Sequence, residues 1–138
     1  MSMDYSIAIK LHTECNEENV EAILENGTRK GFRYYDQIGE VRDTPDILDA
    51  RQVAKKIIEA HDTKPEFGPC VYTMLDTTTY DNAYLWFYEV DDGFLEFQMG
   101  SFGSPKKKDI FIDFDYYIRM CLDLCKNFQI LEVRTTMD

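Results

Sequence analysis

The chain has 138 residues, of which 44% are hydrophobic and 14% aromatic, enough apolar material for the core of one ordinary domain. Its 26 acidic and 15 basic side chains give a formal net charge of −11, which argues against direct binding to nucleic acid or an anionic membrane. No stretch approaches the ~18 apolar residues of a membrane span, and the start of the chain lacks a secretory signal, so we expect a cytoplasmic protein.

The first residues of the chain predict a strand, a helix and a second strand. Residues 5–11 alternate apolar and polar side chains, which is typical of a half-buried strand. Asn16 offers a side-chain cap for a helix over 16–30, and Gly31 can adopt the left-handed conformation that ends it. Residues 32–35 then resume an extended pattern. The inner face of the first strand should carry Ile7, Ile9 and Leu11.

A second helix is predicted to begin at Thr44, Pro45 and Asp46. Threonine can cap free amides, proline tolerates the first helical position and aspartate favours the helix dipole. His61 closes this helix, where an imidazolium complements the dipole. The expected core stripe is Ile47, Ala50, Ala54, Ile57 and Ile58, and the outer face should carry Arg51, Lys55 and Lys56.

The middle of the chain predicts a loop and three strands. Residues 63–69 contain two prolines and a glycine, and residues 70–75 follow as a strand. Residues 83–90 and 94–99 are strand-like runs separated by Asp91-Asp92-Gly93, whose Asp-Gly step predicts a hairpin. A two-residue turn and a bulged three-residue turn are both compatible with this sequence, so either Glu89 or Tyr88 faces Glu96.

The last third predicts a loop over 100–108, a third helix and a final strand over 130–135. Asp113 or Asp115 can cap the helix. The expected helix stripe is Tyr117, Cys121, Leu124, Cys125 and Phe128. This order of elements predicts a single α+β domain over 1–138, with a mostly antiparallel sheet of five to six strands and about three helices packed mainly on one face.

Cysteine and histidine residues are candidates for metal or nucleophile chemistry. His12 and Cys15 have a ligand-like separation, and Cys121 and Cys125 lie one helical turn apart, which would suit a Zn²⁺ site. Cys121 and Cys125 also belong to an apolar stripe, so we favour packed, reduced thiols for these cysteines and for Cys70, with no metal and no cofactor. A cysteine nucleophile beside His12 or His61 has no supporting motif.

Two further segments have partial catalytic or anion-binding signatures. Residues 100–104, followed by three lysines at 106–108, have the ingredients of a phosphate cradle but lack the order of a P-loop, so we favour an exposed loop. Glu89 and Glu96 would lie ~5 Å apart if directly opposed, a separation typical of a retaining glycosidase. Like charges also occur on solvated faces, and we assign no catalytic residue.

The most unusual feature is the 41-residue run between Lys64 and Lys106, which contains no lysine or arginine. It holds ten of the 19 aromatic residues and seven carboxylates. Tyr84, Trp86 and Tyr88 share one strand parity and Leu85 and Phe87 the other, so this strand is either covered on both faces or exposes one as a binding surface. The seven carboxylates are Glu66, Asp76, Asp81, Glu89, Asp91, Asp92 and Glu96.

These features favour an acidic protein-binding module, most concretely an inhibitor or immunity-type protein that neutralises a basic enzyme such as a nuclease toxin. The predicted partner-binding residues are Asp76, Asp81, Trp86, Glu89, Asp91, Asp92 and Glu96. One alternative is a small enzyme or ligand-binding protein with a pocket between the sheet and the third helix. Another is a homo-oligomer, such as a homodimer, that hides the two-sided apolar strand. A solvated acidic surface without a partner is the simplest explanation of the charge.

Overall fold

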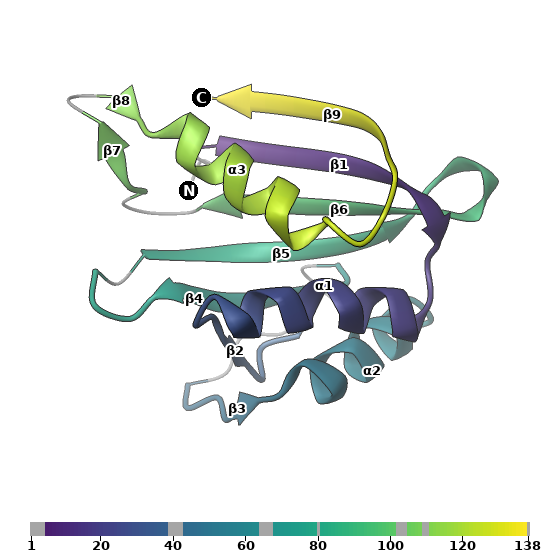
Figure 1. The fold of residues 1–138 in the computed structure, drawn as a ribbon. Coiled ribbons are helices and arrows are strands. Elements are labelled where there is room, and N and C mark those ends of the chain that lie inside the picture. The colour runs from purple at the N-terminus through teal and green to yellow at the C-terminus, as the bar shows by residue number, and fades with distance from the viewer. Residues whose placement is uncertain are drawn as a thin grey trace.

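The computed structural model describes residues 5–38, 43–63, 68–79, 81–101, 105–108 and 111–137. Its strands are β1 (Tyr5–Glu14), β2 (Arg33–Tyr35), β3 (Ile47–Leu48), β4 (Cys70–Asp76), β5 (Asp81–Glu89), β6 (Phe94–Ser101), β7 (Lys107–Lys108), β8 (Phe111–Ile112) and β9 (Ile130–Met137). Its helices are α1 (Glu17–Arg29), α2 (Ala50–Ala60), α3 (Phe114–Leu124) and the single 3-10 turn η1 (Asp91–Gly93). The fold is α+β, as predicted (Figure 1).

Seven strands form one sheet in the order β3-β2-β4-β5-β6-β1-β9, and β7 pairs with β8 in a separate two-stranded sheet. Every pairing in both sheets is antiparallel. The main sheet therefore has more strands than the predicted five to six. The additional strand is β3, which occupies the segment where the second helix was expected to begin. The lysine segment, predicted as loop, contributes β7.

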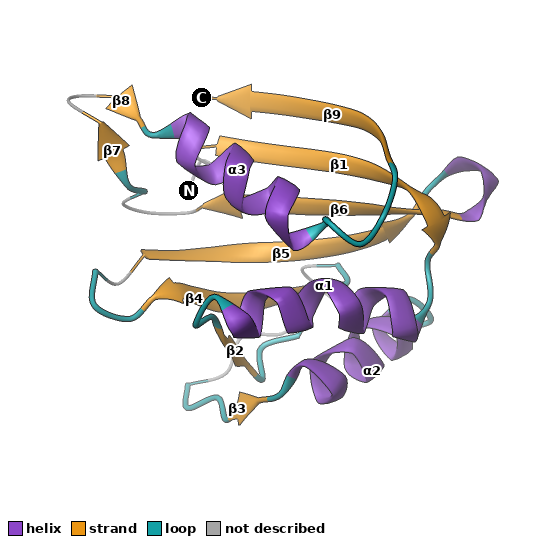
Figure 2. Ribbon diagram, viewed as in Figure 1, coloured by secondary structure: helices purple, strands orange, loops and turns teal. Residues whose placement is uncertain are grey.

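The helices cover one face of the main sheet (Figure 2). α1 runs roughly along the strands in front of β4, α3 lies at an angle in front of β1 and β6, and α2 packs beside α1. The core fills the space between these helices and the sheet, and the side chains predicted for the inner face of β1 (Ile7, Ile9 and Leu11) have no exposed surface. No helix in the described part of the chain is long and apolar enough to cross a bilayer.

The first helix begins where the sequence predicts. The Asn16 side chain accepts a hydrogen bond from the Asn19 amide at 2.9 Å and so satisfies one free N–H group of α1. Near the other end, a methyl group at Gly27 would overlap the hydroxyl of Tyr34. That hydroxyl donates to the Leu24 carbonyl at 2.7 Å, so glycine lets the helix approach β2 closely.

The predicted start of the second helix is wrong. α2 begins at Ala50, after Asp49, whose carboxylate accepts from the Gln52 amide at 2.8 Å while the Gln52 side chain accepts from the Asp49 amide at 3.0 Å. This reciprocal capping box satisfies two amides at once. Ile47 pairs with Tyr35 across the β3–β2 ladder and is 58% exposed, so it does not belong to the core stripe.

The β5–β6 hairpin is confirmed, and its turn has three residues. The Gly93 amide donates to the Val90 carbonyl at 3.0 Å, and Asp92 and Gly93 adopt left-handed φ values of 70° and 77°. In this register Tyr88 faces Glu96, whereas Glu89 faces Leu95. Because neighbouring residues of a strand point to opposite faces, Glu89 and Glu96 lie on different faces of the sheet. Glu89 and Glu96 are therefore not directly opposed, which the glycosidase alternative requires.

The third helix is capped by Asp113, which accepts from the Tyr116 amide at 3.2 Å, and Asp115 instead pairs with Arg119. Tyr117, Cys121 and Leu124 from the predicted stripe are fully buried. The remaining two members differ, since Cys125 is buried and Phe128 is only partly buried. Gly100 and Ser101 extend β6 and are not part of a loop.

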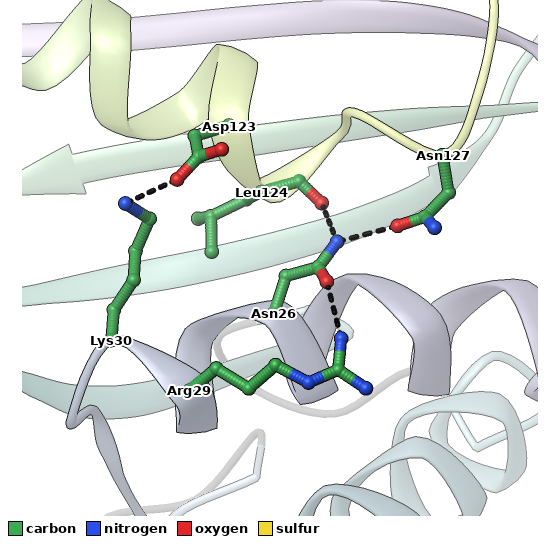
Figure 3. A network of polar contacts seen from close by, with 6 residues as sticks. All are labelled: Asn26, Arg29, Lys30, Asp123, Leu124 and Asn127. Carbon is green, nitrogen blue, oxygen red and sulfur yellow. Dashed lines mark hydrogen bonds and ion pairs between the residues drawn. The ribbon is translucent and has the colours of Figure 1, made fainter.

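A polar network connects α1 to the end of α3 (Figure 3). Asn26 is only 3% exposed, and its amide donates to the Leu124 carbonyl at 2.8 Å and to Asn127 at 2.6 Å. The Leu124 carbonyl would otherwise be a free acceptor at a buried helix end, so Asn26 satisfies α3 from a neighbouring element. Arg29 donates to the Asn26 oxygen at 3.0 Å, and Lys30 forms an ion pair with Asp123.

Candidate functional site

The face of the main sheet opposite the helices carries a row of aromatic side chains. We call Tyr35, Tyr72, Tyr84, Trp86 and Tyr88 the aromatic face; all five are partly buried. Ring centroids are 5.6 Å apart for Tyr35 and Tyr72, 5.4 Å for Tyr72 and Tyr84, and 5.7 Å for Tyr84 and Trp86. The row therefore runs across β2 and β4 onto β5, and Tyr88 continues it along β5 toward the hairpin turn.

Strand alternation produces this arrangement. On β5, Ala83, Leu85 and Phe87 are buried on the helix side, while Tyr84 and Trp86 point to the other side. No helix among the described elements covers that second side. The two apolar parities of β5 thus have different roles: one contributes to the core, and the other forms a broad aromatic surface.

Three tyrosines of the aromatic face are neutral hydrogen-bonding groups. Burial raises the pKa of Tyr72, Tyr84 and Tyr88 above the ordinary value, and neighbouring tyrosine or cysteine groups add to the effect. Each hydroxyl consequently keeps its proton at physiological pH. Rigid rings with a polar tip are the side chains most enriched at protein interfaces, because they supply contact area at low entropic cost.

Glu96 was predicted to present a free charge and is instead buried in an ion pair. Only 6% of the residue is exposed, and its carboxylate binds the Arg134 guanidinium and accepts from the Gln98 amide at 2.9 Å. A buried carboxylate needs such partners to offset its desolvation. Glu96 is therefore neutralised by Arg134 and adds little to the negative electrostatic potential that a partner would meet outside the molecule.

Three other predicted residues gather at one end of the sheet. Glu89, Asp91 and Asp92 are exposed at the β5–β6 turn, where the Cys15 amide donates to the Gly93 carbonyl at 3.2 Å. This contact brings the start of α1 to the turn. Glu17, Glu18 and Glu21 line a hollow of about 430 Å³ with Arg51 of α2. We call this surface the acidic end; it comprises Glu14, Glu17, Glu18, Glu21, Glu89, Asp91 and Asp92.

The carboxylates of the acidic end affect the pKa of the Cys15 thiol. Burial raises its pKa to about 11, and the charges of Glu89 and Glu14 contribute in the same direction. A thiol with this pKa remains protonated and is a poor nucleophile or metal ligand at neutral pH. All four cysteines are free, and the described residues contain no group of three His, Cys, Asp or Glu side chains placed to hold a metal.

Asp81 lies at the opposite end of β5 and is buried. Only 6% of it is exposed, and the Tyr117 hydroxyl donates to its carboxylate, 2.9 Å from each oxygen. Burial raises the pKa of Asp81, and the hydrogen bond from Tyr117 partly opposes this rise. The same hydroxyl accepts from the Lys106 amide at 2.6 Å. Asp81, which was predicted to bind a partner, therefore has its carboxylate inside the fold and not on the surface.

A small cavity of about 250 Å³ adjoins this carboxylate. Its lining includes Asp76, Asp81, Lys106 and Tyr116, and the Lys106 ammonium lies 4.0 Å from the centre of the Tyr116 ring. Hydrogen bonds from the hydroxyl and amide of Thr78 lower the pKa of Asp76. Two carboxyl groups at one cavity thus have pKa values shifted in opposite directions, which is the arrangement that acid–base chemistry requires.

The predicted site residues therefore occupy three separate places. Asp81 and Glu89 are at the two ends of a nine-residue strand, about 26 Å apart at ~3.3 Å per residue. Trp86 lies between them on the aromatic face. Sequence reasoning missed the glutamates of the β1–α1 junction, although Asn16 was recognised as a helix cap and marks the place where they cluster. Glu66 lies outside the described residues.

The chain was also compared with protein-family models, with curated protein sequences and with solved structures. None of the three comparisons found a match. The geometry described above is therefore the basis for a functional assignment.

Proposed function

We propose that this protein binds a basic protein partner through the aromatic face and the acidic end. The observation that carries the proposal is the row of four rings, Tyr35 to Trp86, on the sheet face that no described helix covers. Interfaces draw most of their binding energy from aromatic anchors at the centre of the contact. Trp86 is the largest ring of the aromatic face and lies at the end of the row that is nearer to Tyr88 and the acidic end.

Electrostatics favour a basic partner over a neutral one. The chain has a formal net charge of −11, and the acidic end groups seven carboxylates beside few cations. Carboxylates displayed in this way accelerate the approach of a positively charged surface and repel acidic competitors. Tyr88 and Glu89 are neighbours on opposite faces of β5, so the aromatic face and the acidic end meet at the hairpin turn, and a partner contacts both by reaching around that turn.

The most concrete form of this function is an inhibitor or immunity-type protein that acts in the cytoplasm. A nuclease must present cations to hold phosphates, and a cluster of carboxylates on a rigid turn can occupy the same cations. η1 is anchored on both sides, by the hairpin ladder and by the contact from Cys15, so its acids are held in place before binding. Such preorganisation reduces the entropic cost of association.

The proposal is tested by capturing partners on the immobilised protein at low and high salt, and then measuring binding kinetics with each purified partner. Glu89→Gln, Asp91→Asn and Asp92→Asn together should slow association and flatten its salt dependence. The matched control is Asp43→Asn, Asp46→Asn and Asp115→Asn, which removes the same charge from exposed positions outside the acidic end. Equal association rates for the two triple variants would contradict the role of the acidic end.

Trp86→Ala tests the aromatic face separately. The loss of an interface anchor should raise the dissociation rate roughly tenfold or more, with a smaller effect on association. Phe111→Ala is the control, because it truncates an aromatic ring that is 68% exposed on β8, away from this face. A normal dissociation rate for Trp86→Ala would remove the aromatic face from the proposal.

A second candidate function, a small-ligand or acid–base site, is favoured by the buried Asp81 carboxylate beside its cavity. The volume of about 250 Å³ is below the 300–1,000 Å³ typical of drug-sized ligands, so the cavity suits a ligand of few heavy atoms. Asp81→Asn should abolish binding in a calorimetric or NMR screen of small polar compounds and leave partner association unchanged. Retention of every ligand by Asp81→Asn would contradict this second candidate.

A further inference from the structure

The strand β9 forms one border of the main sheet, with a free outer edge. It pairs with β1 on its inner side, and no other described strand pairs with it (Figure 1). Its eight residues extend for about 23 Å at ~3.3 Å per residue. A long edge presents unpaired amides and carbonyls along its length, and such an edge is a template for another strand.

Apart from the charges of Glu132 and Arg134, β9 lacks the features that protect an edge strand. Leu131 and Val133 are 44% and 42% exposed, although both are large apolar residues. β9 contains no proline or lysine, and its only register shift against β1 lies near its first residue. Proline, lysine and central bulges are the features that proteins commonly use to block edge pairing. The border strand β3, at the other side of the sheet, has only two residues.

The charges of β9 select one register for a second copy of the same strand. Glu132 and Arg134 lie on one face of the sheet. An antiparallel pair of identical strands with Val133 on the two-fold axis places Glu132 opposite Arg134 of the other copy, twice. Moving the axis to Glu132 would oppose two glutamates, and moving it to Arg134 would oppose two arginines. Cross-strand pairs of opposite charge stabilise a sheet, and pairs of like charge destabilise it.

We propose that two copies of this chain associate through β9 in an antiparallel pair centred on Val133, which joins the two main sheets into one. The interface is isologous, since the same residues contribute from both copies. The surroundings are locally balanced in spite of the net charge of the chain: Lys10 and Arg134 lie beside Glu96 and Glu132 on the same face. This association is independent of the proposed binding to a basic partner.

Disulfide cross-linking tests the register directly. Val133→Cys places the two new thiols opposite each other, with Cβ atoms about 4.5–5.5 Å apart, close enough to form a disulfide with small adjustments. Thr135→Cys is the control, because its two thiols would be displaced by four residues along the strands, about 13 Å. With a mild oxidant, Val133→Cys should form a covalent dimer on a non-reducing gel, and Thr135→Cys should not.

Sedimentation velocity over a concentration series tests whether the association exists without a cross-link. The wild type should dimerise, and Glu132→Lys should weaken the dimer roughly tenfold, because each introduced lysine then opposes Arg134 of the other copy. The control is Ile47→Lys, which introduces a lysine in β3 at the other border of the sheet and should leave the dimer intact. Urea denaturation of each variant verifies folding. A monomeric wild type at every concentration, or equal cross-linking of the two cysteine variants, would overturn the proposal.

Discussion

The two ends of β5 carry carboxylates in very different environments. At one end, Asp91 and Asp92 project from a tight turn into solvent, close to the glutamates that begin α1. At the other end, Asp81 is buried, accepts a hydrogen bond from Tyr117 and lines a small cavity together with Lys106. All three aspartates belong to the same cation-free segment of sequence. Their chemistry differs because tertiary packing controls solvation, and solvation controls whether a carboxylate acts as a charge or as a proton carrier.

The two ends of β5 also suit the two candidate functions differently. The acidic end has exposure and charge density, which suit long-range attraction of a partner. The Asp81 end has a small cavity and a carboxyl group with a raised pKa, which suit a small ligand. The aromatic face lies between them and adds contact area near the acidic end through Tyr88.

The largest expected effect is at the buried end. Tyr117→Ala should lower the free energy of unfolding by about 3–5 kcal/mol, because the ring has no exposed surface and stacks on Tyr5 at 4.3 Å. Tyr117→Phe keeps the ring and removes the hydroxyl that donates to Asp81, at a cost of about 1–3 kcal/mol. Urea denaturation measures both. A loss below about 1 kcal/mol for the alanine variant would show that this end is not the packed region described here.

The stability of the turn at the acidic end depends on the backbone conformation of its residues more than on the packing of their side chains. Asp92 has a φ of 70°, a region that β-branched residues strongly disfavour. Asp92→Val should therefore lower the free energy of unfolding by about 1–2 kcal/mol. Asp92→Gly should change it by less than about 0.5 kcal/mol, because glycine accepts this φ and loses more chain entropy. Equal denaturation midpoints for the valine and glycine variants would exclude the left-handed turn.

The pH dependence of stability should distinguish Asp81 from Asp76. Burial raises the pKa of Asp81 above its ordinary 3.8. Just above pH 3.8, the Asp81 carboxyl group is therefore more protonated in the folded state than in the unfolded chain. The free energy of unfolding should fall as the pH rises through the raised pKa, and Asp81→Asn should remove that slope. Denaturation midpoints measured against pH provide the test.

Asp76 should behave in the opposite way. Its pKa is lowered by hydrogen bonds from Thr78, so its contribution to stability is complete above pH 3.8 and is lost as the pH falls through the lowered pKa. Asp76→Asn should therefore alter only the acidic limb of the profile. If both asparagine variants changed the same limb, the contrast between the two aspartates would be wrong.

The smallest expected effect on stability is at the acidic end itself. Glu89→Gln with Asp91→Asn and Asp92→Asn should change the free energy of unfolding by no more than about 0.5 kcal/mol, since these side chains are exposed. Any change should be stabilising at low salt, where like charges repel most strongly. Thermal denaturation at two ionic strengths measures it. A loss of more than about 1 kcal/mol would indicate that these acids are structural.

The sequence alone was sufficient for those features that depend on neighbouring residues. Asn16 and Asp113 cap their helices through amides three residues away, although the sequence left Asp113 and Asp115 as alternative caps. The Asp-Gly step placed the hairpin turn, although the sequence left open whether the turn has two or three residues. Alternation identified the core side of β1, and the order of elements indicated an antiparallel α+β fold with helices on one face. In each of these cases the interacting groups are close in the chain, so the local pattern carries the information.

Other features were decided only by contacts between distant segments. Thr44 and Pro45 form a good local helix start, yet Ile47 pairs with Tyr35 of β2 and is held in a strand, so the helix begins only after Asp49. The capping box of Asp49 and Gln52 is itself a local signal that competes with Thr44 and Pro45. The burial of Asp81 depends on Tyr117, 36 residues later, and that of Glu96 on Arg134, 38 residues later. A carboxylate has the same sequence signature in water and in a core. Its function depends on the groups that replace its hydration shell, and these come from other strands and helices.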